Sequence, residues 1–309
     1  MRSLCLALSL LPGLAMASPL RVVATIPDLA ALAREVGQDH ASVRSLALPT
    51  QDPHFVDARP HLALELNKAD LLVLAGLDLE IGWLPVLITG SRNPRIQPGS
   101  EGYFDASAYA VLKEVPRVKI DRAMGDVHPG GNPHYLVDPR NAIRVAHALA
   151  ERMAKLDPEH GDIFEHNAAA FEKAARARMA EWEKLLAPYR GAKVVTYHKS
   201  WIYLLDWLGL KELDTIEPKP GIPPNPQHVA RLLIKMKREK PAMILQEAYY
   251  PANTARLLSS KTGVPVLILP GGTDVDSGER YLDHIDRFVR SIAEVLAKAD
   301  ASRTAEAAP

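Results

Sequence analysis

The sequence has almost no cysteine. Its single one, Cys5, lies inside the apolar N-terminal stretch, so a chain that begins after residue 17 would have none. Such a chain forms no disulfide, offers no thiolate to a metal ion, and tolerates export into an oxidising compartment. A lipid-anchoring cysteine sits at a cleavage point that follows the apolar stretch, whereas Cys5 precedes most of it. We therefore do not expect lipidation.

Net charge is also lacking, because 37 Lys and Arg residues balance 37 Asp and Glu residues. This balance gives no reason to expect a nucleic acid or an anionic membrane as a partner. Apolar residues make up 47% of the chain and charged residues 24%, which is typical of soluble globular proteins. The 309 residues allow about two domains.

Long apolar runs are confined to the N-terminus. Arg2 precedes an apolar run over residues 4–14, and the following Ala-Met-Ala at 15–17 matches an A-x-A cleavage site. The run is shorter than the roughly 20 residues that a membrane-spanning helix needs. We therefore expect residues 1–17 to be a signal peptide that is cleaved after Ala17.

Short apolar runs alternate with segments of helical spacing along most of the remaining chain. Strands are expected in six of these runs, namely 19–26, 42–48, 70–76, 192–198, 241–247 and 264–270. The alternation predicts parallel sheets with helices on both faces, which is an α/β fold. The last ten residues, 300–309, have the composition of a disordered tail.

A long segment of helical spacing, 158–189, separates the two halves. Asp157 suits an N-cap and the following proline suits the first helical position. A helix of about 28 residues would reach about 42 Å, which is more than one small domain needs. We interpret it as a strut between two doubly wound α/β lobes, residues 18–157 and 190–299. The alternative is one long helix that packs on a single domain.

Three of the eleven histidines lie just beyond the carboxyl end of an apolar run. They are His54 after 42–48, His134 in the loop after 115–120, and His198 at the end of 192–198. The carboxyl ends of strands in doubly wound sheets face the crevice where ligands bind. We therefore predict that the three imidazoles meet in the cleft between the lobes and share one metal ion. The competing explanation is chance, since loops often contain histidine.

Neighbouring side chains favour the metal hypothesis. Asp52 and Asp138 lie close in sequence to His54 and His134, where a carboxylate could accept the free ring N–H of a ligating imidazole. Proline directly precedes both of these histidines and restricts the backbone there. That restriction lowers the entropy that is lost when an imidazole is held for a ligand.

A carboxylate could complete a shell of three nitrogens and one oxygen. Glu247 ends the run 241–247, while Asp274 and Asp276 follow the run 264–270. Three imidazoles without a thiolate suit Zn²⁺, with copper and nickel as chemical competitors, whereas Mn²⁺ prefers more oxygen ligands.

Five stretches of the sequence together resemble the solute-binding proteins of bacterial zinc and manganese ABC importers. They are PTQDPHFVDARP, NKADLLVLAGLDLEIGWLP, GNPHYLVDPRNA, VVTYHKSW and IEPKPGIPPNPQHV. The resemblance runs from about Arg21 to Lys298 and implies two α/β lobes joined by one long helix, with the metal between them. By motif it assigns His54, His134 and His198 as the metal ligands. Manganese-type relatives often have glutamate in the third position, so His198 favours zinc.

The resemblance also implies a function without catalysis. The protein would capture Zn²⁺ in the periplasm as a monomer and deliver it to an ABC-type metal permease in the inner membrane. A periplasmic metal donor is a further expected partner, and no nucleic acid is expected.

The sequence departs from the family pattern at two places. Members often supply an aspartate ligand shortly after the last strand, where this chain reads LPGG. The fourth ligand is then Glu247, Asp274 or water, with Glu247 preferred. Many zinc-type members also have a long His-rich loop before the second ligand, which here is reduced to RAMGDVHPGGN. Its His128 is either a remnant that offers a transient first contact or an ordinary solvated histidine.

Two other functions are alternatives to metal import. A zinc hydrolase also combines three histidines with a bound water, but the sequence has no HExxH helix, no G-x-S-x-G turn and no evident general base. An adhesin-like surface protein is disfavoured because neither a lipid anchor nor a stalk is expected.

Overall fold

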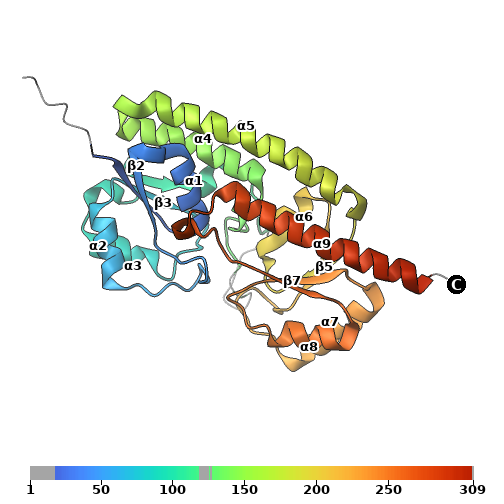
Figure 1. The fold of residues 1–309 in the computed structure, drawn as a ribbon. Coiled ribbons are helices and arrows are strands. Elements are labelled where there is room, and N and C mark those ends of the chain that lie inside the picture. The colour runs from blue at the N-terminus through green and yellow to red at the C-terminus, as the bar shows by residue number, and fades with distance from the viewer. Residues whose placement is uncertain (1–17, 118–124, 126, 308–309) are drawn as a thin grey trace, which may run out of the picture.

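The computed structural model describes residues 18–117, 125 and 127–307 (Figure 1). The predicted signal peptide, with Cys5 and the cleavage site after Ala17, lies outside these residues. Among the described residues, no helix combines the length and the apolar character of a transmembrane span.

Each of two lobes is built on a parallel four-stranded sheet. The N-terminal sheet has the order β2-β1-β3-β4, from β1 (Leu20–Ala24), β2 (Ala41–Ser45), β3 (Leu71–Leu74) and β4 (Tyr103–Asp105). The C-terminal sheet repeats it as β6-β5-β7-β8, from β5 (Lys193–Thr196), β6 (Lys211–Thr215), β7 (Met243–Glu247) and β8 (Val266–Leu269). The order reverses beside β1 and beside β5, and ligands of doubly wound sheets bind at such reversals.

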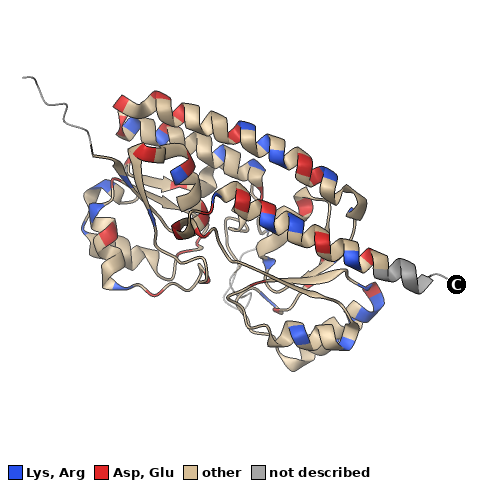
Figure 2. Ribbon diagram, in the orientation of Figure 1, with Lys and Arg blue, Asp and Glu red and all other residues tan. Residues whose placement is uncertain are grey.

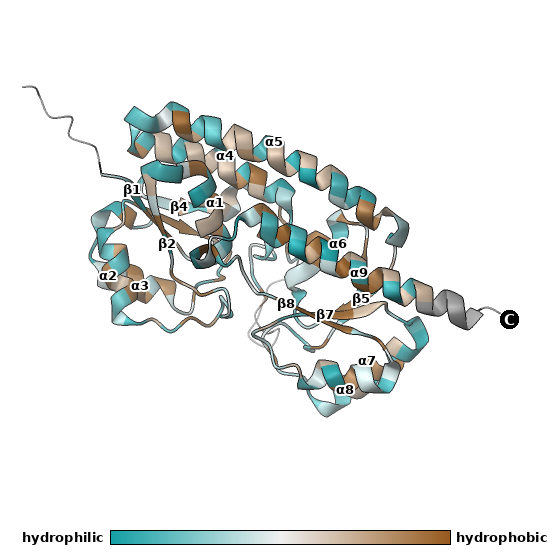
Figure 3. Ribbon diagram, viewed as in Figure 1, coloured by the Kyte–Doolittle hydropathy of each residue, from teal (hydrophilic) through white to brown (hydrophobic). Residues whose placement is uncertain are grey.

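Helices cover both faces of each sheet, so the predicted fold class is confirmed. The outer faces are covered by α2 (Pro60–Lys68), α3 (Leu84–Ser91), α7 (Pro226–Glu239) and α8 (Asn253–Thr262), which form a separate hydrophobic cluster with each sheet. The other faces are covered by α1 (Pro27–Gly37), α4 (Pro139–Leu156), α6 (Ile202–Trp207) and α9 (Tyr281–Ala307), whose buried side chains share one hydrophobic cluster with the strands. The buried strands β5 and β7 are hydrophobic, while the helices are mixed (Figure 3). Charges of both signs lie along α9, whereas the charged side chains of α7 and α8 are almost all Lys and Arg (Figure 2).

The six predicted strands coincide with observed strands, but the apolar run at 115–120 does not provide one. Residues 115–117 are not in a strand, and 118–120 lie outside the described residues. Val115 is exposed, and the edge of the sheet is instead formed by β4 at Tyr103–Asp105. An apolar run whose side chains stay exposed is not stabilised by joining a sheet, because strands are stabilised mainly by side-chain burial and packing. His134 therefore reaches the cleft by another route than a strand exit.

The long helix α5 (Gly161–Leu186) lies within the predicted segment and runs along both lobes (Figure 1). One short 3₁₀ turn lies at each of its ends. Its side chains Phe164, Phe171 and Trp182 are fully buried or nearly so, in a hydrophobic cluster that extends through both lobes. Because α5 also packs against α1, α4 and α9, it is part of a helical layer shared by the two lobes rather than an isolated strut.

A second connection joins the lobes. After β8 the segment 270–280 crosses to the N-terminal lobe, where Thr273 donates from its backbone N and its Oγ1 to Oδ1 of Asp28, at 3.0 and 2.5 Å. Arg280 then pairs with Glu35 of α1 at 2.5 Å. The following helix α9 runs back along the C-terminal lobe (Figure 1).

Helix α9 also corrects the prediction of a disordered tail over 300–309. The helix continues to Ala307, and residues 308–309 lie outside the described residues. Residues 300–307 contain no glycine or proline, and adding residues to an existing helix is far easier than starting one. The polar composition alone therefore misled the prediction.

Candidate metal centre

Three imidazoles from distant parts of the chain meet between the lobes. One ring nitrogen each from His54, His134 and His198 lies within 4.8 Å of those of the other two. The three ring centroids are 5.2–5.3 Å apart. Two nitrogens bound tetrahedrally to zinc at about 2.0–2.1 Å are about 3.4 Å apart. Small side-chain adjustments therefore suffice for one ion to contact all three.

The three histidines lie on segments that other parts of the chain hold in place. His54 lies in a turn after β2, where the buried Trp83 donates from its Nε1 to the carbonyl oxygen of Pro53 at 2.9 Å. His134 directly precedes a 3₁₀ turn that leads into α4. His198 lies between β5 and the 3₁₀ turn Lys199–Trp201.

Carboxylates orient two of the rings. Nδ1 of His54 lies 2.8 Å from Oδ1 of Asp52, and Nδ1 of His198 lies 2.8 Å from Oε2 of Glu217. If each Nδ1 donates its proton to the carboxylate, each Nε2 has a free lone pair for a metal ion. Burial raises the pKa of Asp52, but its hydrogen bonds and charge interaction with His54 outweigh this effect and lower it.

These contacts confirm the sequence prediction for Asp52 and correct the one for Asp138. Asp138 caps α4 and accepts hydrogen bonds from Arg140, both from its backbone N and from its guanidinium. Asp138 is the N-cap residue of α4, so its carboxylate accepts hydrogen bonds from the first turn of the helix rather than from an imidazole. Glu217 was not predicted, although it belongs to the stretch IEPKPGIPPNPQHV.

The Nε2 atom of His134 is buried and has no hydrogen-bond partner in the described part of the chain. Burial, together with the neighbouring His198, His54 and His128, holds the pKa of His134 well below its usual value. The ring is therefore neutral at neutral pH. A buried ring nitrogen without a hydrogen-bond donor lowers the stability of the folded protein, and a bound cation would remove this penalty.

Hydrogen bonds across the lobe boundary fix the segment before His134. The side-chain amide of Asn132 donates to the carbonyl oxygen of Lys199 at 2.8 Å. The hydroxyl of Tyr203 donates to the carbonyl oxygen of Asn132 at 2.7 Å and accepts from the backbone N of Lys113 at 2.9 Å. Because Lys199 directly follows His198, these bonds hold the segments of two of the three histidines at a set distance.

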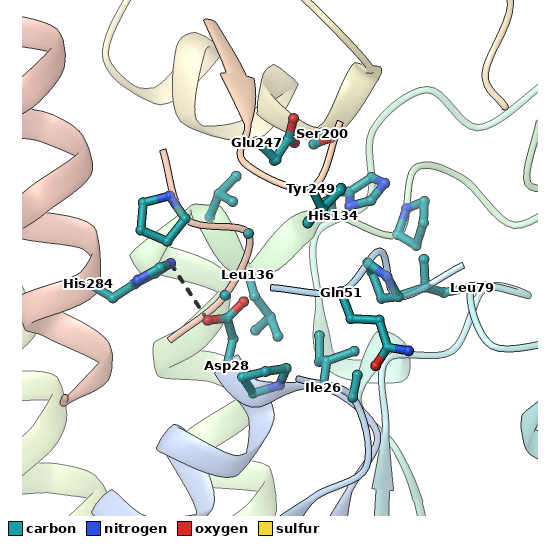
Figure 4. A pocket seen from close by; sticks show the side chains of 18 of the residues that line it. Ile26, Asp28, Gln51, Leu79, His134, Leu136, Ser200, Glu247, Tyr249 and His284 are labelled. Atoms are coloured by element: carbon teal, nitrogen blue, oxygen red, sulfur yellow. Dashed lines mark ion pairs between the residues drawn. The ribbon is translucent and has the colours of Figure 1, made fainter. Parts of the chain in front are cut away.

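Glu247 ends β7 and is only 3% exposed. Neither of its carboxylate oxygens has a hydrogen-bond partner of normal geometry among the described residues, and burial raises its pKa to about 7. It lines a cavity of about 60 Å³ that Ser200 and His134 also line (Figure 4). Its oxygens are not part of the group whose ligand atoms meet within 4.8 Å.

Asp274 is the other residue predicted for the fourth position, whereas His128 is predicted to be either a transient first contact or an ordinary solvated histidine. Asp274 is exposed and accepts a hydrogen bond from the backbone N of Ser277, in the segment that contacts the N-terminal lobe. His128 is half-buried, and its Nε2 lies 3.4 Å from Nε2 of His54. Burial, with His54 beside it, lowers the pKa of His128 to about 4. His128 is therefore not a freely solvated loop histidine.

Comparison with known proteins agrees with this geometry. The sequence model of the family described as the periplasmic component A of the zinc-uptake complex, ZnuA, matches residues 22–295. The zinc-binding lipoprotein AdcA of Streptococcus pneumoniae is 22% identical over 89% of this chain and 55% of its own length, so the chain spans about half of that relative. The manganese ABC transporter substrate-binding lipoprotein PsaA of the same species is 22% identical over 90% of this chain and 89% of its own.

A crystal structure of ZnuA has the same fold. It superposes with a TM-score of 0.75 at 22% identity, and the match covers 90% of this chain and 99% of that one. The two sequence relatives are named for different metals, so the comparison establishes a metal-binding transport component and does not select the ion.

Proposed function

This chain belongs to the family of periplasmic zinc-uptake components, and we propose that it captures Zn²⁺ and delivers it to an ABC-type permease in the inner membrane. The family consists of substrate-binding proteins of ABC importers rather than enzymes. Metal capture for import follows from membership, while the choice of zinc rests on the site.

The observation that supports zinc is the donor set. The ligand atoms that meet are three imidazole nitrogens, from His54, His134 and His198. Nitrogen donors without thiolate suit Zn²⁺, whereas Mn²⁺ favours carboxylates and water. Asp52 and Glu217 strengthen the argument because carboxylates behind ligating imidazoles raise their basicity.

We assign Glu247 as the carboxylate that balances the charge of the bound ion. A divalent ion held by neutral imidazoles brings two positive charges into a buried cleft. Glu247 is a buried carboxylate beside it, and its oxygens have no hydrogen-bond partner of normal geometry in the part of the chain that the structure describes. The cation favours the ionised form of this carboxylate, which in turn offsets part of the charge of the ion.

The location and partners follow from the family and the sequence. Relatives such as AdcA and PsaA are named lipoproteins, which supports a place outside the cytoplasm. For this chain we propose export through the signal peptide at residues 1–17, cleavage after Ala17, and a monomer in the periplasm. There it would receive zinc from a periplasmic donor and dock on the permease.

Competitive titration of the chelator-treated mature protein with Zn²⁺ and Mn²⁺ tests this function. Wild type is expected to bind one Zn²⁺ tightly and Mn²⁺ much more weakly. His134→Ala is expected to lower zinc affinity sharply without unfolding, and exposed His166→Ala serves as the control. Unchanged zinc affinity in His134→Ala would overturn the site. Zinc-dependent turnover of ester or phosphate substrates would instead support the hydrolase.

A further inference from the structure

We propose that His128 is a fourth metal ligand, which completes an all-nitrogen shell with His54, His134 and His198. This inference rests on the proposed function, because it names the donor that fills the remaining position of the same ion.

The distance between His128 and His54 suits a shared cation better than a hydrogen bond. Their Nε2 atoms are 3.4 Å apart. Hydrogen bonds from a ring N–H have donor–acceptor distances of about 2.7–3.2 Å, so this contact is long for one. Two nitrogens bound to one tetrahedral zinc at about 2.0–2.1 Å are about 3.3–3.4 Å apart, which matches the observed distance.

The spacing of the rings agrees with this interpretation. The centroids of His54 and His128 are 5.4 Å apart, close to the 5.2–5.3 Å that separate the three convergent rings. Nδ1 of His54 lies 2.8 Å from Oδ1 of Asp52, so when Nδ1 donates to this carboxylate, the Nε2 that faces His128 carries the free lone pair. Two imidazoles placed with these nitrogens together are arranged as two ligands of one ion.

The surroundings of His128 allow it to complete the shell. His128 lines a cavity of about 180 Å³ together with His134 and His198. The charged side chains there, Glu114 and Lys199, form an ion pair with each other, so they leave little net charge to oppose a cation.

His128 lies outside the three-histidine group, so a local movement must bring its Nε2 onto the ion. Two glycines follow it after Pro129, and Gly131 has a φ of +121°, a conformation that glycine adopts readily. Because His54, His134 and His198 already converge, we expect His128 to bind last when zinc enters and to leave first when zinc is released.

A fourth imidazole also has consequences for metal choice. It occupies the position that a carboxylate or water would otherwise take, and a shell of four nitrogens disfavours oxygen-preferring Mn²⁺. Glu247 then acts through its charge at the back of the site, where its oxygens lie outside the convergent group.

The experiment compares His128→Gln with wild type in the full mature chain, with His61→Gln on the exposed side of α2 as the matched control. Zinc affinity is measured by competition with a chelating dye. Removing a residue that only orients a metal ligand typically lowers metal affinity about 10–100-fold. His128 is proposed to be a ligand itself, so we expect His128→Gln to weaken zinc binding by at least about 100-fold. His61→Gln is expected to bind zinc like wild type.

Coordination is counted independently by X-ray absorption of the zinc-loaded proteins. Multiple scattering from imidazole rings should fall from four histidines in wild type to three in His128→Gln. Three histidines in both proteins, or wild-type affinity in His128→Gln, would overturn the inference. His134→Ala separates the two proposals: if it loses zinc while His128→Gln does not, the proposed function stands and only the fourth ligand is wrong.

Discussion

Glu217 lies directly behind His198, with its Oε2 2.8 Å from Nδ1 of the imidazole. The same Oε2 accepts a hydrogen bond from the backbone N of Gly221 at 3.1 Å. The ring and the loop that carries Glu217 therefore hold each other in position. His54 and Asp52 repeat the arrangement in the other lobe, so each lobe supplies one imidazole whose orientation is set before a metal arrives.

Replacing Glu217 should therefore weaken metal binding without removing a ligand. We expect Glu217→Ala to lower zinc affinity by about 10–100-fold, because the His198 ring loses its orienting acceptor and part of its basicity. Glu217→Gln keeps an acceptor oxygen and should lose less. Competition titration measures both variants, with the exposed Glu181→Ala as control. If Glu217→Ala binds zinc like wild type, the contact has no role in capture.

Tyr203 offers a test of the link between the lobes. Its buried hydroxyl connects Asn132 and Lys113, and Tyr203→Phe leaves those backbone groups without a partner. We expect about 1–3 kcal/mol lower stability and weaker zinc binding, since the segment of His134 is no longer fixed. Urea unfolding and zinc titration check this, beside Tyr109→Phe at a partly exposed site. Equal loss in both variants would contradict the special role of Tyr203.

Glu247 should make the metal-free protein less stable as the pH rises. Burial raises its pKa from 4.5 to about 7. Between pH 4.5 and pH 7, Glu247 is therefore ionised in the unfolded chain but protonated in the folded one. The stabilising contribution is complete below pH 4.5 and is lost as the pH rises through 7. Glu247→Gln should therefore be more stable than wild type at pH 8, by at most about 3 kcal/mol.

The comparison needs unfolding curves of both chelated proteins at pH 5 and at pH 8. The lowered pKa of His134 has the opposite effect on stability, because its stabilising contribution is lost as the pH falls below 6.5. This effect is the same in both proteins, so it cancels in the comparison. With zinc bound the advantage of Glu247→Gln should disappear, since the ion favours the ionised carboxylate. An equal gain at both pH values would exclude ionisation as the cause.

The shared helical layer predicts that the two lobes unfold together. Trp182 of α5 is fully buried and donates from its Nε1 to Asp286 of α9 at 2.8 Å, inside the cluster that joins the lobes. Trp182→Ala should cost about 3–5 kcal/mol and still give one cooperative transition. Calorimetry and urea unfolding followed by two probes test this. Two separate transitions in wild type would show that the lobes are independent.

Much of this protein could be predicted from its sequence. Short apolar runs between helical segments indicated the two α/β lobes, because runs of this length that alternate with helices suit the strands of a parallel sheet. The long helix followed from the helical spacing over 158–189, and the three histidines from their places at the ends of apolar runs. His134 joins the other two histidines although the strand expected before it is missing, since residues 115–117 are not in a strand.

Only the tertiary structure decided which side chains stand beside which. Asp138 is only four residues from His134 in the sequence, yet it caps a helix, while Glu217, nineteen residues from His198, orients the ring. Likewise, the position of His128 against His54 across 74 residues depends on how two loops pack. Local sequence determines helices and strands because these depend on neighbouring residues, whereas contacts between loops depend on the packing of the whole chain.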